Sequence, residues 1–244
     1  MTRRLGISVT VAALVAAALT TGTAPAGAAD PAYGAPTVGQ CFDMDVAELA
    51  ADSYVEAPVD CAGVHTARTI VVAQLPDDLA YGSLGQLTRF ALETCLPAQR
   101  KVLGTSMLGM RMSAYSFGYF MPTPEQQAAG ARWLRCDLVL GGASLEPLPS
   151  RLALGRLPYE KSVSRCLTGR DFRLTVCSSR HAFRATAAMK VKASRFPSGK
   201  AWQRIGTQRC RSAVTSRSYR FGWPSKAAWK AGDRALICYS KTRR

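Results

Sequence analysis

The chain carries the same cysteine-anchored patterns twice, and this repetition constrains its fold more than any other feature. The pattern Pro-x7-Gly-x-Arg-x3-Cys ends at Cys136 and again at Cys238. A second pattern, Cys-x3-His-x2-Arg, begins at Cys61 and again at Cys177. An ordered set of motifs that is kept while the intervening loops change length indicates an internal repeat. The sequence therefore predicts a tandem duplication.

The repeat divides the 244-residue chain into two small modules. We expect the first over 38–140 and the second over 163–244, joined by a linker over 141–162 that contains glycines and prolines. Each copy suggests the order β-β-α-β-(short α)-β, with the third cysteine of each set on the main helix. This order predicts an α+β fold of two tandem disulfide-stapled modules, each an antiparallel sheet with one main helix.

The hydrophobic pattern places the elements within each module. In the first we expect a strand over 68–75, a helix from Leu84 through Cys95, a loop rich in Met and Gly, an extended segment over 115–122, a short helix ended by Gly130 and a strand over 133–140. In the second we expect strands over 172–177, 182–191 and 235–239 and a helix over 202–210.

The first 28 residues have the layout of a secretory signal peptide. Arg3 and Arg4 precede an apolar stretch from Leu5 to Leu19, and small residues then lead to an expected cleavage after Ala28. An uncleaved anchor helix is the alternative. Residues 29–37 then form a flexible leader, and no later stretch approaches 18 apolar residues. We expect a secreted, envelope-associated protein.

Export decides how the eight cysteines are interpreted. In an oxidising compartment, an even number of cysteines at repeated spacings indicates disulfides, and pairing within each module leaves three connectivities per module. We favour first with second and third with fourth, because the first gap varies between copies as a loop between paired strands would. A Cys/His zinc site is the alternative. The favoured bridges are Cys41–Cys61, Cys95–Cys136, Cys166–Cys177 and Cys210–Cys238.

Charge separates the two modules. Residues 29–150 hold 7 Lys or Arg and 13 Asp or Glu, a net charge of −6, whereas residues 151–244 hold 23 and 3, a net charge of +20. With Arg3 and Arg4 the total is +16. Packing does not require these cations, and like charges repel one another, so the second module is expected to bind an anionic partner. A solubilising surface is the alternative.

Outside the cell, that partner would be anionic lipid headgroups or an acidic wall polymer, and nucleic acid ranks last. The oppositely charged modules could also associate with each other between molecules. The candidate anion-binding residues are Lys190, Lys192, Arg195, Arg217, Arg220, Lys226 and Lys230.

The ordered motifs resemble those of the bacterial septum-formation-related domain family. The resemblance rests on Val-Gly-x-Cys ending at Cys41, on Cys-x3-His, on a helical cysteine and on the Pro…Gly-x-Arg-x3-Cys ending, the last three found in both copies. It covers about 38–140 and 163–240. Arg68 and Arg184 stand where that family usually has an acid, and Gln127 replaces its tryptophan. The resemblance implies an exported envelope protein linked to septum formation, and no known reaction.

No motif indicates catalysis, a metal or a cofactor. His65 and His181 occupy the same place in both copies, which favours a turn histidine that donates to backbone. Repetition likewise favours structural roles for Arg132, Arg234, Gly130 and Gly232. The sequence has no nucleophile elbow, no Cys-x-x-Cys and no phosphate-binding glycine loop. An exported hydrolase that uses one of the histidines is the alternative to a non-enzymatic protein.

The cysteine pairing predicts a specific peptide map. Proteolysis of the secreted protein without reduction, followed by mass spectrometry, should yield the four bridged peptide pairs named above and no bridge between modules. Alkylation before reduction should label no cysteine. A bridge between modules, or four or more free thiols, would contradict the two-module interpretation.

Overall fold

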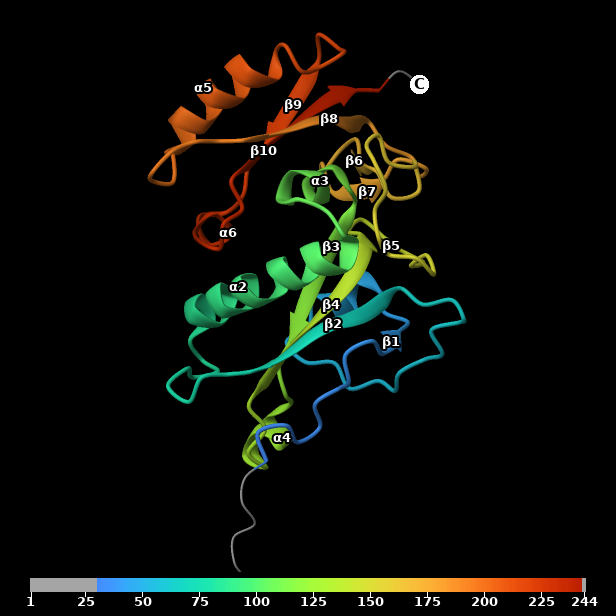
Figure 1. Cartoon of the computed structure of the whole chain (residues 1–244), viewed down its shortest axis with the longest axis vertical. Helices are drawn as coiled ribbons and strands as arrows, with labels where there is room; N and C mark the ends of the chain where they lie inside the picture. Colours follow the sequence, from blue (N-terminus) through green and yellow to red (C-terminus); the bar gives the residue numbers. More distant parts are fainter. Residues whose placement is uncertain (1–29, 243–244) are drawn as a thin grey trace, which may run out of the picture.

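The computed structural model describes residues 30–242, and these form two five-stranded antiparallel sheets, one above the other (Figure 1). The predicted signal peptide and its cleavage point lie outside the described residues. Within the part that is described, no helix is long and apolar enough to cross a membrane. The mixture of antiparallel sheets and helices confirms the α+β class.

The first sheet has the strand order β1-β2-β4-β3, with β5 paired to the end of β4. Helix α2 packs across one face of this sheet, and α1, α3 and α4 are short. The bounds are β1 Cys41–Phe42, α1 Val46–Leu49, β2 Ala67–Gln74, α2 Leu84–Leu103, α3 Met107–Met112, β3 Tyr115–Phe120, α4 Pro124–Ala128, β4 Trp133–Gly141 and β5 Leu145–Glu146.

The second sheet has the order β7-β6-β8-β10-β9, and α5 packs across it. Gly206 lies in the middle of α5 because Phe221 approaches there so closely that a Cβ atom would be 2.3 Å from the ring. The bounds are β6 Arg165–Leu167, β7 Leu174–Val176, β8 Phe183–Lys190, α5 Gly199–Cys210, β9 Tyr219–Gly222, α6 Lys226–Lys230 and β10 Ala235–Lys241.

The two sheets match strand by strand. The order β1-β2-β4-β3 corresponds to β6-β8-β10-β9, with the main helix following β2 in one sheet and β8 in the other. Even an irregularity is shared: the ladder register shifts at Ile70 in β2 and at Thr186 in β8, which are both five residues after the histidine. These correspondences support the interpretation of the halves as tandem copies.

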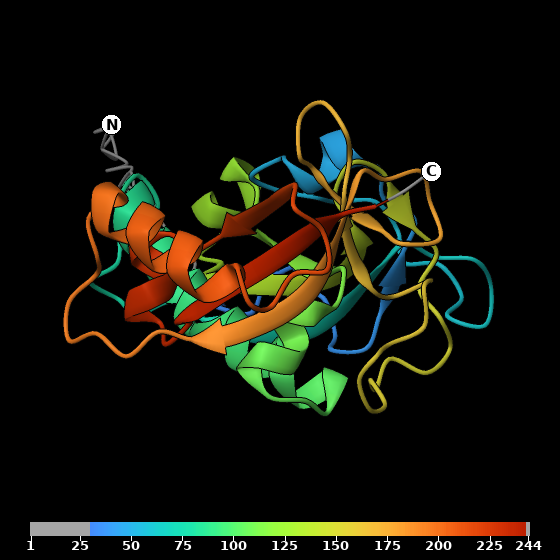
Figure 2. The same ribbon diagram turned by 90° about the horizontal axis from the view of Figure 1, so that it is seen from above.

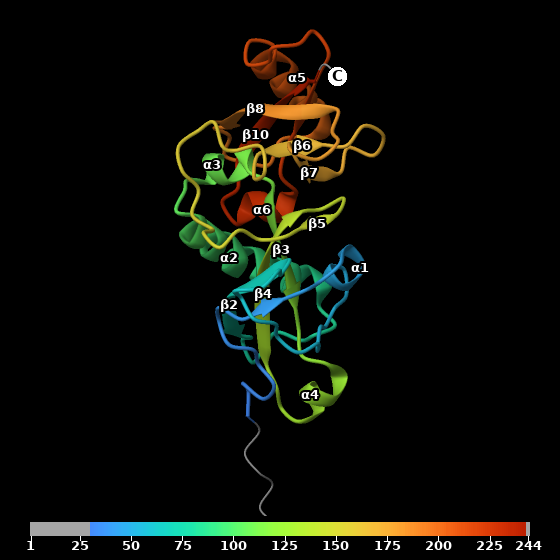
Figure 3. The same cartoon turned by 90° about the vertical axis from the view of Figure 1, so that its right-hand side faces the viewer.

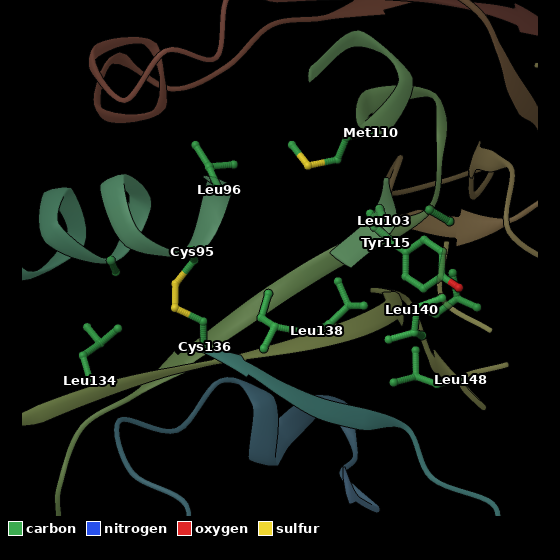
Figure 4. Close-up of a cluster of buried hydrophobic side chains, with 14 of the residues drawn as sticks. Cys95, Leu96, Leu103, Met110, Tyr115, Leu134, Cys136, Leu138, Leu140 and Leu148 are labelled. Atoms are coloured by element: carbon green, nitrogen blue, oxygen red, sulfur yellow. A yellow bond between two sulfur atoms is a disulfide. The ribbon is translucent and has the colours of Figure 1, made fainter. Parts of the chain in front are cut away.

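The cysteines pair as predicted, in four disulfides with no free cysteine among the described residues. Two of the bridges connect a main helix to a central strand. Cys95 of α2 is bonded to Cys136 of β4, as Figure 4 shows, and Cys210 of α5 is bonded to Cys238 of β10. The other two bridges staple β1 and β6 to the loops beside them.

Helix α2 forms where its apolar spacing predicts it. Leu87, Ala91 and Cys95 recur every four residues, and each is at most 1% exposed. They face the sheet, where Leu134 and Leu138 of β4 complete the core (Figure 4). Gly104 ends the helix in the left-handed conformation at φ +59°, a common helix ending.

The expected linker over 141–162 packs against the first sheet. Strand β5 lies within it, and Leu148, Leu152 and Tyr159 are each at most 8% exposed. The Leu148 N–H donates to the carbonyl of His65 at 2.8 Å, and the Leu154 N–H donates to that of Leu103 at 2.9 Å. The core of the first half also includes Val176 of β7, whereas Trp202, Trp229 and Leu236 belong to a separate cluster in the second half.

Two further segments expected to be irregular make defined contacts. In its described part, the leader expected over 29–37 contacts the start of β4: the carbonyl of Pro31 accepts from the Arg132 N–H at 2.8 Å, and that of Tyr33 accepts from the Trp133 indole at 2.9 Å. The Met- and Gly-rich loop contains helix α3, which Ser106 caps by accepting from the Gly109 N–H.

Helix α3 connects the two halves. It packs against β8 and β10 of the second sheet, and Met112 contacts the apolar cluster on that face. Arg111 forms an ion pair with Asp233, which lies just before β10 and is 1% exposed. Burial lowers the pKa of Arg111 from its ordinary value, and the Asp233 carboxylate opposes this effect. Figure 3 shows α6 between the second sheet and α2, a second contact between the halves.

Breaking the Arg111–Asp233 pair should destabilise the whole molecule. We expect Arg111→Met to lower the free energy of unfolding by about 3 kcal/mol, because it leaves a buried carboxylate without its cation. The matched control is Arg89→Met, which removes an ion pair to Glu93 whose side chains are 63% and 44% exposed and which should cost less than about 0.5 kcal/mol. Urea denaturation monitored by circular dichroism measures both. Equal effects of the two substitutions would contradict this role of α3.

Candidate anion-binding site

Three of the predicted anion-binding residues meet in one hollow beside the start of α5. The hollow has a volume of about 640 Å³ and is formed by the loop between β8 and α5, by the start of α5, by α6 and by Arg234 just before β10. We call it the basic pocket, and define it by the cations Arg195, Lys226, Lys230 and Arg234 and by the aromatic residues Phe196 and Trp229.

The floor of the basic pocket is aromatic. Trp229 of α6 is 4% exposed, and its ring packs edge-on against Phe196 and Trp202 at centroid distances of 5.9 and 5.7 Å. Ser225 caps α6 by accepting from the Ala228 N–H at 3.1 Å, which fixes the helix that carries Lys226 and Lys230. The floor is therefore rigid, and the cations stand at its edge.

The cations of the basic pocket differ in whether they already have an interaction partner. Arg234 donates to the carbonyl of Ala193 at 2.8 Å and lies over the Trp229 ring at 4.7 Å, so it is already engaged. Arg195, Lys226 and Lys230 are exposed, and none lies within 4.0 Å of a carboxylate of residues 30–242. Three unpaired cations around an apolar floor form a site that attracts anions.

The other four predicted anion-binding residues do not join the basic pocket. Arg217 lines a separate hollow at the opposite end of α5. Arg220 lies over the ring of Phe172 at 4.0 Å, and Lys190 and Lys192 are exposed near the end of β8. The structure thus divides the predicted set between two ends of the second sheet.

Sequence reasoning missed part of the site around Arg217. Arg184, Arg211 and Lys241 also line this region, together with several hydroxyl side chains. The signal lay in the repeat itself, because Thr186 and Ser240 stand where the first copy has Ile70 and Leu138. Polar residues in place of core residues indicate that this stretch of the second sheet is not part of an apolar core like that of the first half.

Both histidines make the same local contact. Nδ1 of His65 lies 2.9 Å from the carbonyl of Gly63, and Nδ1 of His181 lies 2.8 Å from that of Ser179. Because a carbonyl only accepts, Nδ1 carries the proton and donates across the turn in each copy. The geometry is that of the turn histidine the repeat predicts.

The repeated arginines and glycines also occupy matching positions. Arg132 donates to the carbonyl of Leu79 at 3.0 Å, and Arg234 donates to that of Ala193 at 2.8 Å. Arg132 therefore holds the loop that follows β2, and Arg234 holds the loop that follows β8. Gly130 and Gly232 follow the short helices with φ of +97° and +95°, a conformation that favours glycine. Within residues 30–242 there is no group of three or more His, Cys, Asp or Glu placed to hold a metal ion.

Comparison with known proteins gives one match. The family model described as septum formation matches residues 80–218, which is more than half of the chain. The match is a single continuous segment from just before α2 to just before β9, so it spans both halves, and the two-copy placement stays a prediction. No curated protein and no solved structure matches the chain.

The histidine contacts separate a structural role from a catalytic one. We expect His65→Gln and His181→Gln each to lower the free energy of unfolding by about 1 kcal/mol, the usual net contribution of a hydrogen bond. The measurement is urea denaturation of each variant beside wild type, with Gln86→Ala on the exposed start of α2 as the control. Unchanged stability in both histidine variants would contradict the structural role and favour the alternative of a hydrolase that uses one of the histidines.

Proposed function

The chain belongs to the septum formation family, and from this premise we propose that it is an exported, non-enzymatic envelope protein whose second half binds an anionic envelope component. The component would be an acidic wall polymer or anionic lipid headgroups. The first half then serves as the scaffold that presents this cationic end at the cell surface.

The observation that carries the proposal is that the cations of the second half are unpaired. Residues 151–244 hold 23 Lys or Arg against 3 Asp or Glu. Among the described residues, none of these Lys or Arg side chains lies within 4.0 Å of a carboxylate. Asp233, one of the three acids, is paired with Arg111 of the first half. The charge is therefore available to a partner.

Concentrating +20 in one half has a cost, because like charges repel in the folded state. Packing does not explain the charge, since Arg195, Arg217, Lys226 and Lys230 are all exposed. A partner that supplies negative charge would relieve the repulsion. Such binding would depend strongly on ionic strength, because exposed charges are screened over about 8–10 Å at 0.1–0.15 M salt.

Export is supported by the disulfides. Four bridges join all eight cysteines, and disulfides persist in oxidising compartments such as the cell exterior. Each bridge stabilises the fold by about 2–4 kcal/mol, mainly by restricting the unfolded chain. The same bridges would protect a small, highly charged structure outside the cell.

Binding of the full chain to isolated cell envelope tests the proposal. We expect co-sedimentation at 50 mM salt that falls steeply by 300 mM, and weaker binding by the triple variant Arg195→Gln, Lys226→Gln, Lys230→Gln, by roughly threefold or more from three exposed contacts. The matched control is Lys161→Gln, Arg170→Gln, Arg180→Gln, which removes equal charge from exposed positions outside the basic pocket.

The outcomes of this experiment distinguish a partner at the cationic end from a solubilising surface. Salt-sensitive binding with a larger loss in the pocket variant than in the control supports a partner at the cationic end. Binding that does not depend on salt, or no binding, would contradict it and leave the charge as a solubilising surface. Sedimentation of the protein without envelope shows whether the oppositely charged halves instead associate between molecules at low salt.

A further inference from the structure

The main helices of the two halves differ in one respect. Helix α2 begins 11 residues before its cysteine (95 − 84) and continues eight residues past it (103 − 95), whereas α5 begins 11 residues before its cysteine (210 − 199) and ends there. Viewed from above, the orange helix α5 covers one end of the red strand β10, and the other end continues beyond it (Figure 2). The second sheet therefore has a stretch of its helix-bearing face that no helix covers.

The side chains on this stretch have changed accordingly. In the first half, Ile70, Leu138 and Leu140 belong to the core together with Leu103 of α2. At the matching positions the second half has Thr186, Ser240 and Thr242. The loop after α5 turns over these residues, where the Thr215 N–H donates to the Ser240 hydroxyl at 2.9 Å. Hydroxyls have replaced the apolar residues at the place where the helix is missing.

Two adjacent hollows lie at this place. Their volumes are about 800 and 720 Å³, and they share Thr215, Ser216 and Arg217. The first is also lined by Arg184 and Lys241, and the second by Thr207 and Arg211. We call the two together the hydroxyl groove, and define it by Arg184, Arg211, Thr215, Ser216, Arg217 and Lys241.

The groove and the basic pocket lie at opposite ends of α5, and a line of cations connects them. Lys200, Arg204 and Arg211 are exposed on α5 or at its C-cap, and their spacing of four and seven residues places them on one face of the helix. At 1.5 Å per residue, this line is about 16 Å long. It begins next to Gly199 of the basic pocket and ends at Arg211 of the hydroxyl groove.

We propose that a linear phosphodiester polymer without nucleobases binds along α5, with one phosphate in the hydroxyl groove and further phosphates over the cations toward the basic pocket. The inference rests on the proposed function and specifies its ligand. Arginine and hydroxyl donors approach the groove from β8, β10 and the loop over 211–218, an arrangement that suits a tetrahedral anion better than a planar carboxylate.

The surroundings of the groove argue against two other ligands. Tyr219 is the only aromatic residue of its lining, so the groove offers a stacking surface for one base and none for a run of bases. Every exposed large hydrophobic side chain of the described residues precedes residue 173, and the last is Phe172. The track along α5 therefore offers nothing to insert between lipid acyl chains.

Binding of a fluorescent glycerol-phosphate oligomer to the full chain tests the proposal. We expect the triple variant Arg211→Gln, Arg217→Gln, Lys241→Gln to bind roughly tenfold more weakly than wild type, from the loss of three charged contacts. The matched control is again Lys161→Gln, Arg170→Gln, Arg180→Gln, which should change binding less than threefold. A six-unit oligomer should bind more tightly than a single glycerol phosphate, because only the longer ligand spans the track.

A variant that removes no charge tests the proposal even if the triple variant does not fold. The hydroxyl of Thr215 lines both hollows and makes no hydrogen bond within residues 30–242, so Thr215→Val should weaken binding by severalfold and leave the thermal midpoint and the salt dependence unchanged. If the triple variant does not fold, this substitution decides the outcome. Wild-type binding by Thr215→Val in that case would overturn the proposal.

Competing ligands separate this inference from the proposed function. Single-stranded DNA, polygalacturonate and anionic vesicles should each compete less well than the glycerol-phosphate oligomer. Equal competition by any of them would overturn the choice of a polymer without bases, and undiminished binding by both groove variants would overturn the site. In either case, salt-sensitive envelope binding that depends on the basic pocket would leave the proposed function standing.

Discussion

Each half of the molecule depends on a disulfide between the main helix and a central strand of the sheet. Cys95–Cys136 and Cys210–Cys238 fix the helix above the strand at the same point of the two sheets. Apolar residues before the cysteine fill the space under each helix, with Leu87 and Ala91 in one and Trp202 in the other. Once this point is fixed, the course of the chain beyond the cysteine can differ without loss of the framework.

That freedom explains how two matching sheets came to present different surfaces. In the first half, α2 continues past its cysteine and buries Leu138 and Leu140 beneath it. In the second half, the helix stops, hydroxyls replace the leucines, and arginines and a lysine line the stretch of the sheet that the helix does not reach. The first half in turn supplies α3, whose Arg111 neutralises Asp233 and adds to the charge asymmetry. One half is thus a scaffold, and the other carries the accessible cations.

The sequence predicted what the repeat determines locally. Disulfide pairing, the order of elements along the chain, the turn contacts of His65 and His181 and the structural roles of Gly130 and Gly232 follow from motifs a few residues long. It did not predict features that depend on distant partners. Helix α3 and the packed segment over 141–162 are held by contacts with residues far away in the chain. The sequence places the end of α5 correctly at Cys210, but it does not reveal that α2 continues past Cys95 to Leu103, so it did not show that helices cover the two sheets to different extents.

Hydrogen–deuterium exchange of the full chain, with and without isolated anionic envelope polymer, tests the central claim most directly, because it locates the bound surface without any substitution. The account predicts slower exchange over 199–217 and 240–242 in the complex. Exchange over 43–60, where the first half carries exposed acids such as Asp43 and Asp45, should not change. Protection confined to the first sheet, or binding without protection along α5, would contradict the account.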